Sequence, residues 1–273
     1  MIYLRLAGGL GNQLFQLGAA IKLSKVNGAE IRISTLGLSA YSEIRTVGLF
    51  QIIEVASHPC KIDLSSNSIS LIADKIRIGR WIPIVGISDR NIISSSKGYI
   101  PNTLFLDGYF QDFWKKEEFL ELIDGLKPLL KREKLKDVRI DQNDLLVHFR
   151  GGDFINHPDL SVVDFEWFKR SVRHALNKNE YVSHIKILSE DESSAFKLKD
   201  YLEGKICRPI SVIHSETICS DFNLISSASL KIISNSTFAF WGHALGDGIA
   251  YSPPLVRKGV SRKWALKNEF FIQ

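Results

Sequence analysis

Short apolar runs alternate with amphipathic stretches along most of this chain, and the first of them predict a strand, a helix and a second strand. Residues 2–6 (IYLRL) form an apolar run with the length and composition of a buried strand. Residues 12–26 place apolar side chains at helical spacing, and the Asn-Gly pair at 27–28 tolerates the left-handed conformation that ends many helices. Apolar and polar residues then alternate over 31–33, which indicates the second strand.

The pattern is weak between residues 35 and 100. Short isoleucine-rich pieces alternate there with clusters of serine and asparagine, which indicates small helices and loops. Residues 104–106 are again strand-like. Residues 114–135 follow a helical pattern that Pro128 interrupts, because proline removes a helical hydrogen bond.

The second half of the chain alternates strands and helices more regularly. Such alternation predicts a parallel, doubly wound sheet, in which ligands bind outside the carboxyl ends of the strands. The strand-like runs are 145–149, 184–188, 210–214 and 231–233, and the helical runs between them are 165–176, 193–202 and 222–229.

A charge-rich segment at 131–144 separates the two halves. It carries few apolar residues, which is typical of a connection between domains. An exposed helix face followed by a turn is the alternative interpretation. We predict an α/β protein with two domains, 1–135 and 140–273.

The composition is that of an ordinary soluble globular protein, with 45% hydrophobic and 24% charged residues. There is no apolar run near the length of a transmembrane helix, and the N-terminus lacks the order of a secretory signal. The spacing of the three cysteines fits no zinc site. A formal net charge of +5 favours an anionic partner, but no aromatic–basic signature of RNA binding accompanies it, so we expect no nucleic acid.

The most informative strand end is the one after residues 145–149, where Arg150 is followed by Gly151 and Gly152 and then by Asp153. An arginine at the end of a buried strand is unfavourable unless an anion meets it. Two adjacent glycines let a ligand approach the backbone closely. The alternative is an Arg–Asp pair that closes an ordinary turn.

The glycine-rich loop near the N-terminus leaves a second functional class open. Gly9 and Gly11 follow the first predicted strand, and Glu30 lies roughly 20 residues further on, as in a dinucleotide-binding fingerprint. Leu14 stands where the third glycine of that fingerprint belongs. An NAD-dependent oxidoreductase is therefore one hypothesis for the function. The structural alternative is that this loop is a simple tight turn.

Four stretches together resemble glycosyltransferase family 11, the α-1,2-fucosyltransferases. Residues 148–153 (HFRGGD) are similar to the H-x-R-R-G-D motif of that family. The other stretches follow the family in the same order, namely GGLGNQLFQ at 8–16, GYFQ at 108–111 and SNSTFAFWGHAL at 234–245. They span nearly the whole chain, and several motifs in register are far more specific than one.

The resemblance implies a GT-B architecture, in which two Rossmann-like domains face a cleft, with an acceptor-side N-terminal domain and a GDP-sugar-binding C-terminal domain. It implies an inverting enzyme that moves L-fucose from GDP-β-L-fucose to the 2-hydroxyl of a galactoside. The acceptor would be a glycan or a lipid-linked oligosaccharide of a bacterial surface polysaccharide such as the O-antigen of lipopolysaccharide. We expect no cofactor, and a cytoplasmic protein or one peripheral to the inner face of the membrane.

Site residues follow from the same resemblance and from their chemistry. Arg150 can fork onto two phosphate oxygens, and the helix N-terminus expected at 235–237 can bind an anion. Asp221 is expected to accept from guanine N–H groups, or else to cap a helix that starts at Phe222. The predicted catalytic residues are His148, Arg150 and Asp153, and the predicted donor-binding residues are Gly9, Gly11, Asn12, Asp221, Asn235, Ser236 and Thr237.

Two of these assignments keep alternatives. His148 is expected near the ribose and phosphates of the donor, or is a satisfied strand histidine. The general base is expected to be Asp153 or Asp159, the nearest carboxylates in the sequence, unless the departing phosphate takes the proton. Since no Asp-x-Asp triplet stands at a strand end, we expect no metal.

Gly151 departs from the family pattern, which has a second arginine at this position. The departure admits a different GDP-sugar, such as GDP-colitose, or a GDP-sugar binder without turnover. It also suggests a variant: Gly151→Arg restores the pattern and should be tolerated or raise activity if this strand end is open to the cleft.

Overall fold

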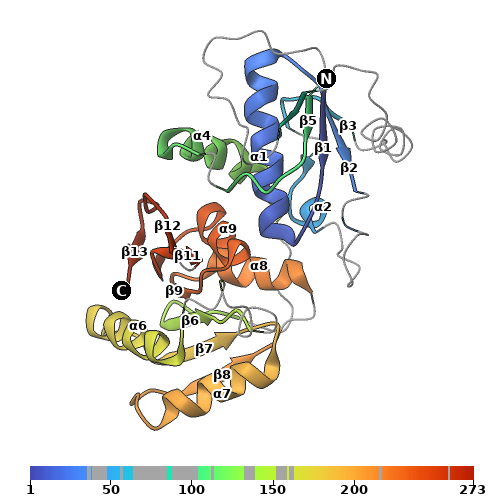
Figure 1. The fold of residues 1–273 in the computed structure, drawn as a ribbon. Helices are drawn as coiled ribbons and strands as arrows, with labels where there is room; N and C mark the ends of the chain where they lie inside the picture. Colours follow the sequence, from blue (N-terminus) through green and yellow to red (C-terminus); the bar gives the residue numbers. More distant parts are fainter. Residues whose placement is uncertain are drawn as a thin grey trace. The chain divides into compact units, whose positions relative to one another are not determined.

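The structure is a computed structural model (Figure 1), and its two compact units comprise Met1–Lys131 and Arg132–Gln273. The acceptor and donor roles of the predicted domains 1–135 and 140–273 stay predictions. The residues that the structure describes are 1–35, 38, 48–55, 58–63, 85–87, 104–111, 114–131, 139–151, 159, 163–214, 217–257 and 259–273.

The first unit is built on a five-stranded parallel sheet with the strand order β3-β2-β1-β5-β4. The long helix α1 (Leu10–Asn27) runs along this sheet and is buried over most of its length, and Gly28 ends it in the left-handed conformation that the sequence predicted. The strands are β1 (Ile2–Arg5), β2 (Ile31–Ser34), β3 (Ile62–Asp63), β4 (Val85–Ile87) and β5 (Leu104–Leu106). Among its described residues, the unit also has the helices α2 (Leu49–Ile52) and α4 (Lys116–Leu126) and the 3-10 turn η4 (Lys127–Leu129), which contains Pro128.

The second unit is built on a six-stranded parallel sheet with the strand order β13-β10-β9-β6-β7-β8. Its central strands are β6 (Asp144–His148), β7 (His184–Leu188), β8 (Ile210–Ile213) and β9 (Leu230–Ile233). The helices are α6 (Phe165–Lys178), α7 (Glu192–Glu203), α8 (Ile218–Ser227) and α9 (Thr237–Leu245). The predicted parallel sheet with intervening helices is therefore confirmed.

Side chains of β6 show why this sheet is covered on both faces. Leu145 and Val147 belong to a hydrophobic cluster with α6 and α7, whereas Leu146 belongs to a separate cluster with α8 and α9. Because successive side chains of a strand point to opposite faces, a run of consecutive apolar residues needs a helix layer on each side. Figure 1 shows the two pairs of helices on opposite faces of the sheet.

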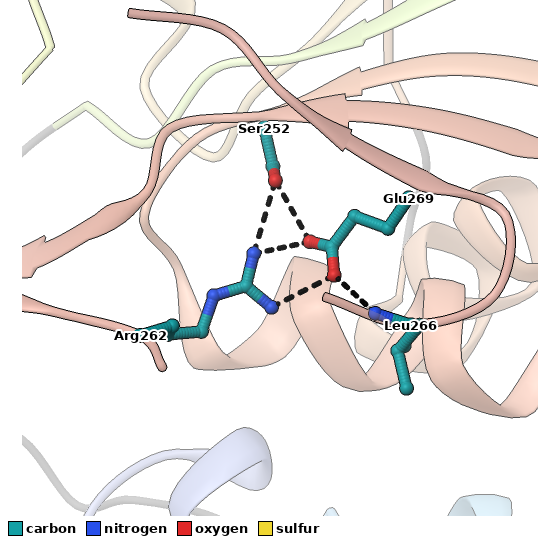
Figure 2. A network of polar contacts seen from close by, with 4 residues as sticks. All are labelled: Ser252, Arg262, Leu266 and Glu269. Carbon is teal, nitrogen blue, oxygen red and sulfur yellow. Dashed lines mark hydrogen bonds and ion pairs between the residues drawn. The ribbon is translucent and has the colours of Figure 1, made fainter. Parts of the chain in front are cut away.

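The C-terminal part of the chain contains strands that the sequence pattern did not indicate. β10 (Ile249–Ser252) and β13 (Glu269–Phe271) extend the second sheet in parallel, and β11 (Leu255–Arg257) pairs antiparallel with β12 (Val260–Ser261). A polar network holds this region together (Figure 2). The carboxylate of Glu269, 4% exposed, binds the guanidinium of Arg262, the hydroxyl of Ser252 and the backbone N–H of Leu266.

Burial alone would raise the pKa of the Glu269 carboxyl. The charge of Arg262 and the hydrogen bonds from Arg262, Ser252 and Leu266 outweigh burial, so the pKa lies below its usual value and the group stays ionised. Arg262 also stacks on Phe240 of α9 and Phe271 of β13, with 4.9 Å from its guanidinium carbon to each ring centroid. The network thus fixes the end of the chain against α9.

Within the described part of the chain, no helix has both the length and the apolar character needed to cross a membrane.

Candidate functional site

The carboxyl ends of β6, β7, β8 and β9 lie at one edge of the second sheet, because all these strands are parallel neighbours. Arg150 follows β6, residues 189–191 follow β7, His214 follows β8 and residues 234–236 follow β9. The N-termini of α7, α8 and α9 lie at the same edge, since each helix follows one of these strands. Ligands of parallel sheets bind at such an edge.

A pocket of about 320 Å³ opens between β7, β8 and the start of α8. Its lining is acidic, with three carboxylates and one imidazole, and includes the exposed apolar side chain of Ile218. Carboxylates accept hydrogen bonds from N–H donors but repel phosphate, so this pocket suits a planar base that carries N–H groups. The lining residues are Ser189, Glu190, Glu192, His214, Thr217, Ile218 and Asp221.

Arg150 forms an ion pair with Glu190, with 2.9 Å between Nη1 and Oε1. The register explains this contact. His148 pairs with Leu188, and the N–H of Phe149 donates to the carbonyl of Leu188, so the residues that follow leave the two strands side by side. Both side chains keep access to solvent, 23% for Arg150 and 38% for Glu190. The arginine is therefore within reach of a dissolved anion.

Gly151 faces the start of α7. A Cβ atom on this residue would lie 2.7 Å from the Cβ of Asp191, closer than side chains approach one another. Asp191 is held there because its carboxylate caps α7, accepting from the N–H of Ser194 at 3.2 Å and from its hydroxyl at 2.5 Å. Any side chain at position 151 therefore requires Asp191 to shift, and the prediction that Gly151→Arg is tolerated stays a prediction.

His148 is 4% exposed and does not line the pocket. Its Nδ1 lies 3.3 Å from the hydroxyl of Ser234 at the end of β9, and its ring packs near that of Phe238. Burial, followed by the charge of Arg150, lowers the pKa of His148 to about 3, so the imidazole is neutral at physiological pH. It joins β6 to β9 as a neutral hydrogen-bonding group, and its predicted catalytic role stays a prediction.

Asp221 lies within the first turn of α8 and lines the pocket. The predicted alternative, that it caps a helix starting at Phe222, is wrong. The helix begins at Ile218, and its cap is Thr217, whose hydroxyl accepts from the N–H of Ser220 at 3.0 Å. The helical pattern in the sequence was recognised only from residue 222 onwards, so the predicted helix start was four residues too late.

The predicted helix N-terminus at 235–237 is present. α9 begins at Thr237, and Ser236 caps it by accepting from the N–H of Ala239 at 3.5 Å. The preceding strand β9 is the neighbour of β6, so this helix end lies beside the strand that carries Arg150. Backbone N–H groups and the positive end of the helix dipole make it suited to an anion.

Gly9, Gly11 and Asn12 belong to the first unit, at the start of α1. Gly9 precedes the helix, and the side chain of Asn12 accepts from Gln111 at 2.9 Å. Gln16 accepts from the N–H of Ala7 and donates to the carbonyl of Gly108, at 3.0 and 2.9 Å. The stretches 8–16 and 108–111 therefore meet at the carboxyl ends of β1 and β5.

Two further features of the first unit bear on the earlier alternatives. Gly8 has a φ of +74°, and a Cβ atom there would lie 2.6 Å from the amide nitrogen of Asn12, so the loop requires glycine at this position, as both a simple tight turn and a ligand-binding loop would. Leu14, where a dinucleotide fingerprint has its third glycine, is fully buried in the core. Close helix–strand packing of the dinucleotide-binding kind thus has no glycine to permit it.

The two carboxylates predicted as candidate bases differ in what the structure describes. Asp153 lies outside the described residues, and Asp159 is exposed. Among the described residues, no group of three or more His, Cys, Asp or Glu side chains could hold a metal ion.

Glu190, Glu192 and His214 line the pocket but were not singled out by the sequence. The available signal was positional, because Glu190 follows the predicted strand 184–188 by two residues and His214 ends the predicted strand 210–214, and parallel sheets bind ligands at such strand ends.

Two comparisons of the sequence with known proteins both identify glycosyltransferases. A sequence profile described as Glycosyl transferase family 11 matches residues 1–252. The chain is 24% identical over 292 residues to an alpha-1,2-colitosyltransferase of Escherichia coli, with 96% of this chain and 94% of the relative covered.

Fucosyltransferases are among the solved structures of similar fold. NodZ from Bradyrhizobium has a TM-score of 0.52 at 13% identity, covering 90% of this chain and 92% of that chain. POFUT1 in complex with GDP-fucose has a TM-score of 0.57 at 10% identity, covering 92% of this chain and 96% of that chain. These likenesses confirm the predicted fold class, α/β with the GT-B architecture.

Proposed function

Because this chain belongs to glycosyl transferase family 11, we propose that it moves L-fucose from GDP-β-L-fucose to the 2-hydroxyl of a galactoside with inversion at the sugar carbon. Family membership makes the protein a glycosyltransferase and leaves the oxidoreductase hypothesis without support. The neighbours in fold support this donor, since one of them is bound to GDP-fucose.

One observation carries the donor proposal: an acidic pocket and a cationic strand end lie on the same edge of the second sheet. The carboxylate of Asp221 suits the N1–H and N2–H groups of guanine, which adenine lacks. Arg150 and the N-terminus of α9 suit the diphosphate. The charge distribution therefore orients the nucleotide, with its base in the pocket and its phosphates towards β6 and β9.

The reaction needs stabilisation of the departing GDP. Negative charge grows on the β-phosphate as the bond to the sugar breaks, and Arg150 together with backbone N–H groups at the start of α9 is placed to receive it. We propose that the reaction needs no metal ion and no other cofactor. His148, neutral and tied to Ser234, would keep β6 and β9 in register beneath the phosphates. Asp153 is proposed as the base that takes the acceptor proton.

The residues proposed for the donor in the first unit are Gly9, Gly11 and Asn12. Gly8 keeps the loop close to Asn12, and Gln111 orients the Asn12 amide, so this strand end presents a fixed polar group. We propose that the first unit serves the acceptor side as well. The acceptor would be a glycan or lipid-linked oligosaccharide of a surface polysaccharide such as O-antigen, met in the cytoplasm or at the inner membrane face.

A second candidate donor is GDP-colitose, a deoxy relative of GDP-fucose. It is favoured by the colitosyltransferase relative and by Gly151, which departs from the family's second arginine. Both donors share GDP, so the same pocket and phosphate site serve either one. A GDP-sugar binder without turnover is the remaining alternative.

The test is a transfer assay with purified protein, GDP-fucose or GDP-colitose, and a panel of galactosides, run with and without excess EDTA. The product linkage is read by NMR. We expect an α-1,2-linked product with one of the two donors at an unchanged rate in EDTA. Tight GDP binding without transfer or donor hydrolysis would leave only the binder, and a different linkage would refute the acceptor position. Complete loss in EDTA that manganese restores would refute the metal-free mechanism.

A further inference from the structure

We infer that Glu190 couples recognition of the base to release of Arg150 for the diphosphate. The inference rests on the proposed function, and it assigns a specificity-determining role to a residue outside the predicted site. Glu190 is suited to it because its carboxylate pairs with Arg150 and also lines the acidic pocket.

The backbone around Glu190 is fixed while its side chain is not buried. The N–H of Asp191 donates to the hydroxyl of Ser189 at 3.1 Å, and the carboxylate of Asp191 caps α7 through Ser194. These contacts hold the loop on both sides of Glu190. The side chain, 38% exposed, thus lies between Arg150 and the pocket on a loop that does not have to move.

A diphosphate and Glu190 compete for the same guanidinium. The contact with Glu190 occupies Nη1, so a fork of Arg150 that uses both Nη atoms on two phosphate oxygens requires this bond to be exchanged. The ion pair is partly exposed and therefore contributes little to the stability of the fold. It should nevertheless weaken the binding of an anion that carries no nucleotide base, because such an anion must displace Glu190 from Arg150. Glu190 thereby acts as an internal anion at the diphosphate site.

When Glu190 leaves Arg150, an N–H group of the bound base can replace the guanidinium as the hydrogen-bond partner of its carboxylate. Guanine carries one hydrogen on N1 and two on N2, which is more than the single carboxylate of Asp221 takes in a paired contact. Glu190 can accept the remaining N–H from the pocket side when it leaves Arg150. A base without the N2 amine offers no such partner, so the exchange is unfavourable and the diphosphate binds less well.

Isothermal titration calorimetry on three proteins tests the coupling: wild type, Glu190→Gln and the control Glu192→Gln. The control removes the same charge from the same pocket, but the contact that Glu192 makes is with His214, at 3.5 Å. The probes are pyrophosphate, guanosine and inosine, because inosine is guanosine without the N2 amine, and GDP serves as the reference. Circular dichroism and melting temperature confirm that each variant is folded.

We expect Glu190→Gln to bind pyrophosphate more tightly than wild type, by up to about fivefold, which is the factor expected for an exposed ion pair. Its preference for guanosine over inosine should shrink by about fivefold, the difference between a charged and a neutral acceptor. Glu192→Gln should show neither the gain for pyrophosphate nor the loss of preference for the N2 amine.

Three results would overturn the inference. Pyrophosphate affinity could be unchanged or weaker in Glu190→Gln, which would make Glu190 a positioning partner of Arg150. The two variants could behave alike, which would reduce the effect to the net charge of the pocket. If wild type binds GDP and either result holds, only this inference fails, whereas a wild type that binds no GDP refutes the proposed function and the coupling together.

Discussion

The Cβ atom that Gly151 lacks would lie 2.7 Å from the Cβ of Asp191, so this backbone does not accommodate a side chain at both positions. The two residues follow the paired strands β6 and β7, and Asp191 is fixed by capping α7. The departure of Gly151 from the family's second arginine is therefore linked to the packing of the β7–α7 loop.

This relationship predicts the behaviour of Gly151→Ala. Because a close-packed contact must shift, the substitution should destabilise the protein by about 1–3 kcal/mol. In an Asp191→Gly background the same substitution should cost much less, since the opposing Cβ is gone and glycine is an acceptable helix cap. Urea unfolding of the two single variants and the double variant measures the coupling, and additive effects would show that the contact is relieved elsewhere.

Asp221 is expected to select guanine. Asp221→Ala should weaken GDP binding by about 1–3 kcal/mol, which is the usual cost of removing the partner of charged hydrogen bonds. The change should leave α8 in place, because Thr217 and not Asp221 caps that helix. Calorimetry with GDP and ADP measures both affinity and discrimination. A variant that binds GDP as well as wild type would remove Asp221 from the base site.

We predict that the free energy of unfolding decreases in mild acid because two histidines are buried. Burial, with the charge of Arg150 second, lowers the pKa of His148 to about 3, and burial, with Lys231 second, lowers that of His243 to about 4. Glu269 acts against this shift at His243, whereas Arg262 adds to it. In the unfolded chain both groups titrate near pH 6.5, so the unfolded state binds more protons below that pH and stability falls as pH decreases.

The expected loss between pH 6.5 and 5 is on the order of 3 kcal/mol for both groups together. His243→Phe should remove about half of that slope. Neither ring nitrogen of His243 has a hydrogen-bond partner among the described residues, so an apolar ring leaves no polar group unsatisfied. Urea unfolding at several pH values measures the slopes. Equal slopes for wild type and variant would mean that His243 takes up no proton difference on folding.

The strands around the site were predictable because buried strands give short runs rich in apolar residues, nearly continuous at 145–149 and alternating at 184–188. The runs at 145–149 and 184–188 correspond to β6 and β7, and the residues after them form the site edge. Arg150 could be singled out because a charge directly after such a run is unusual. The strand–helix order also sufficed to predict parallel sheets.

Side-chain contacts between different strands and turns were not predictable. Ser252, Arg262 and Glu269 are of residue types that usually lie at the surface, and only the fold brings them into one buried network. The strands β10 and β13 were missed because each is short and partly polar. Glu190 escaped notice because its importance lies in its register with Arg150, which no local pattern contains.

The central claim is that Arg150 clamps the diphosphate as the sugar bond breaks. Arg150→Lys keeps the charge, and a lysine can also keep an ion pair with Glu190, so the variant should fold. A lysine cannot fork onto two phosphate oxygens with fixed planar geometry, and Gly151 offers no second cation in the loop. The loss should fall mainly on kcat, because the interaction strengthens in the transition state.

Steady-state kinetics of GDP-sugar transfer by wild type and Arg150→Lys measure this most directly, with circular dichroism to confirm folding. We predict that kcat falls on the order of 10²–10³-fold, as when a donor to a developing oxyanion is lost. A folded Arg150→Lys enzyme whose kcat stays within a factor of about three of wild type, far short of that loss, would show that Arg150 serves only as the ion-pair partner of Glu190 and would contradict the account.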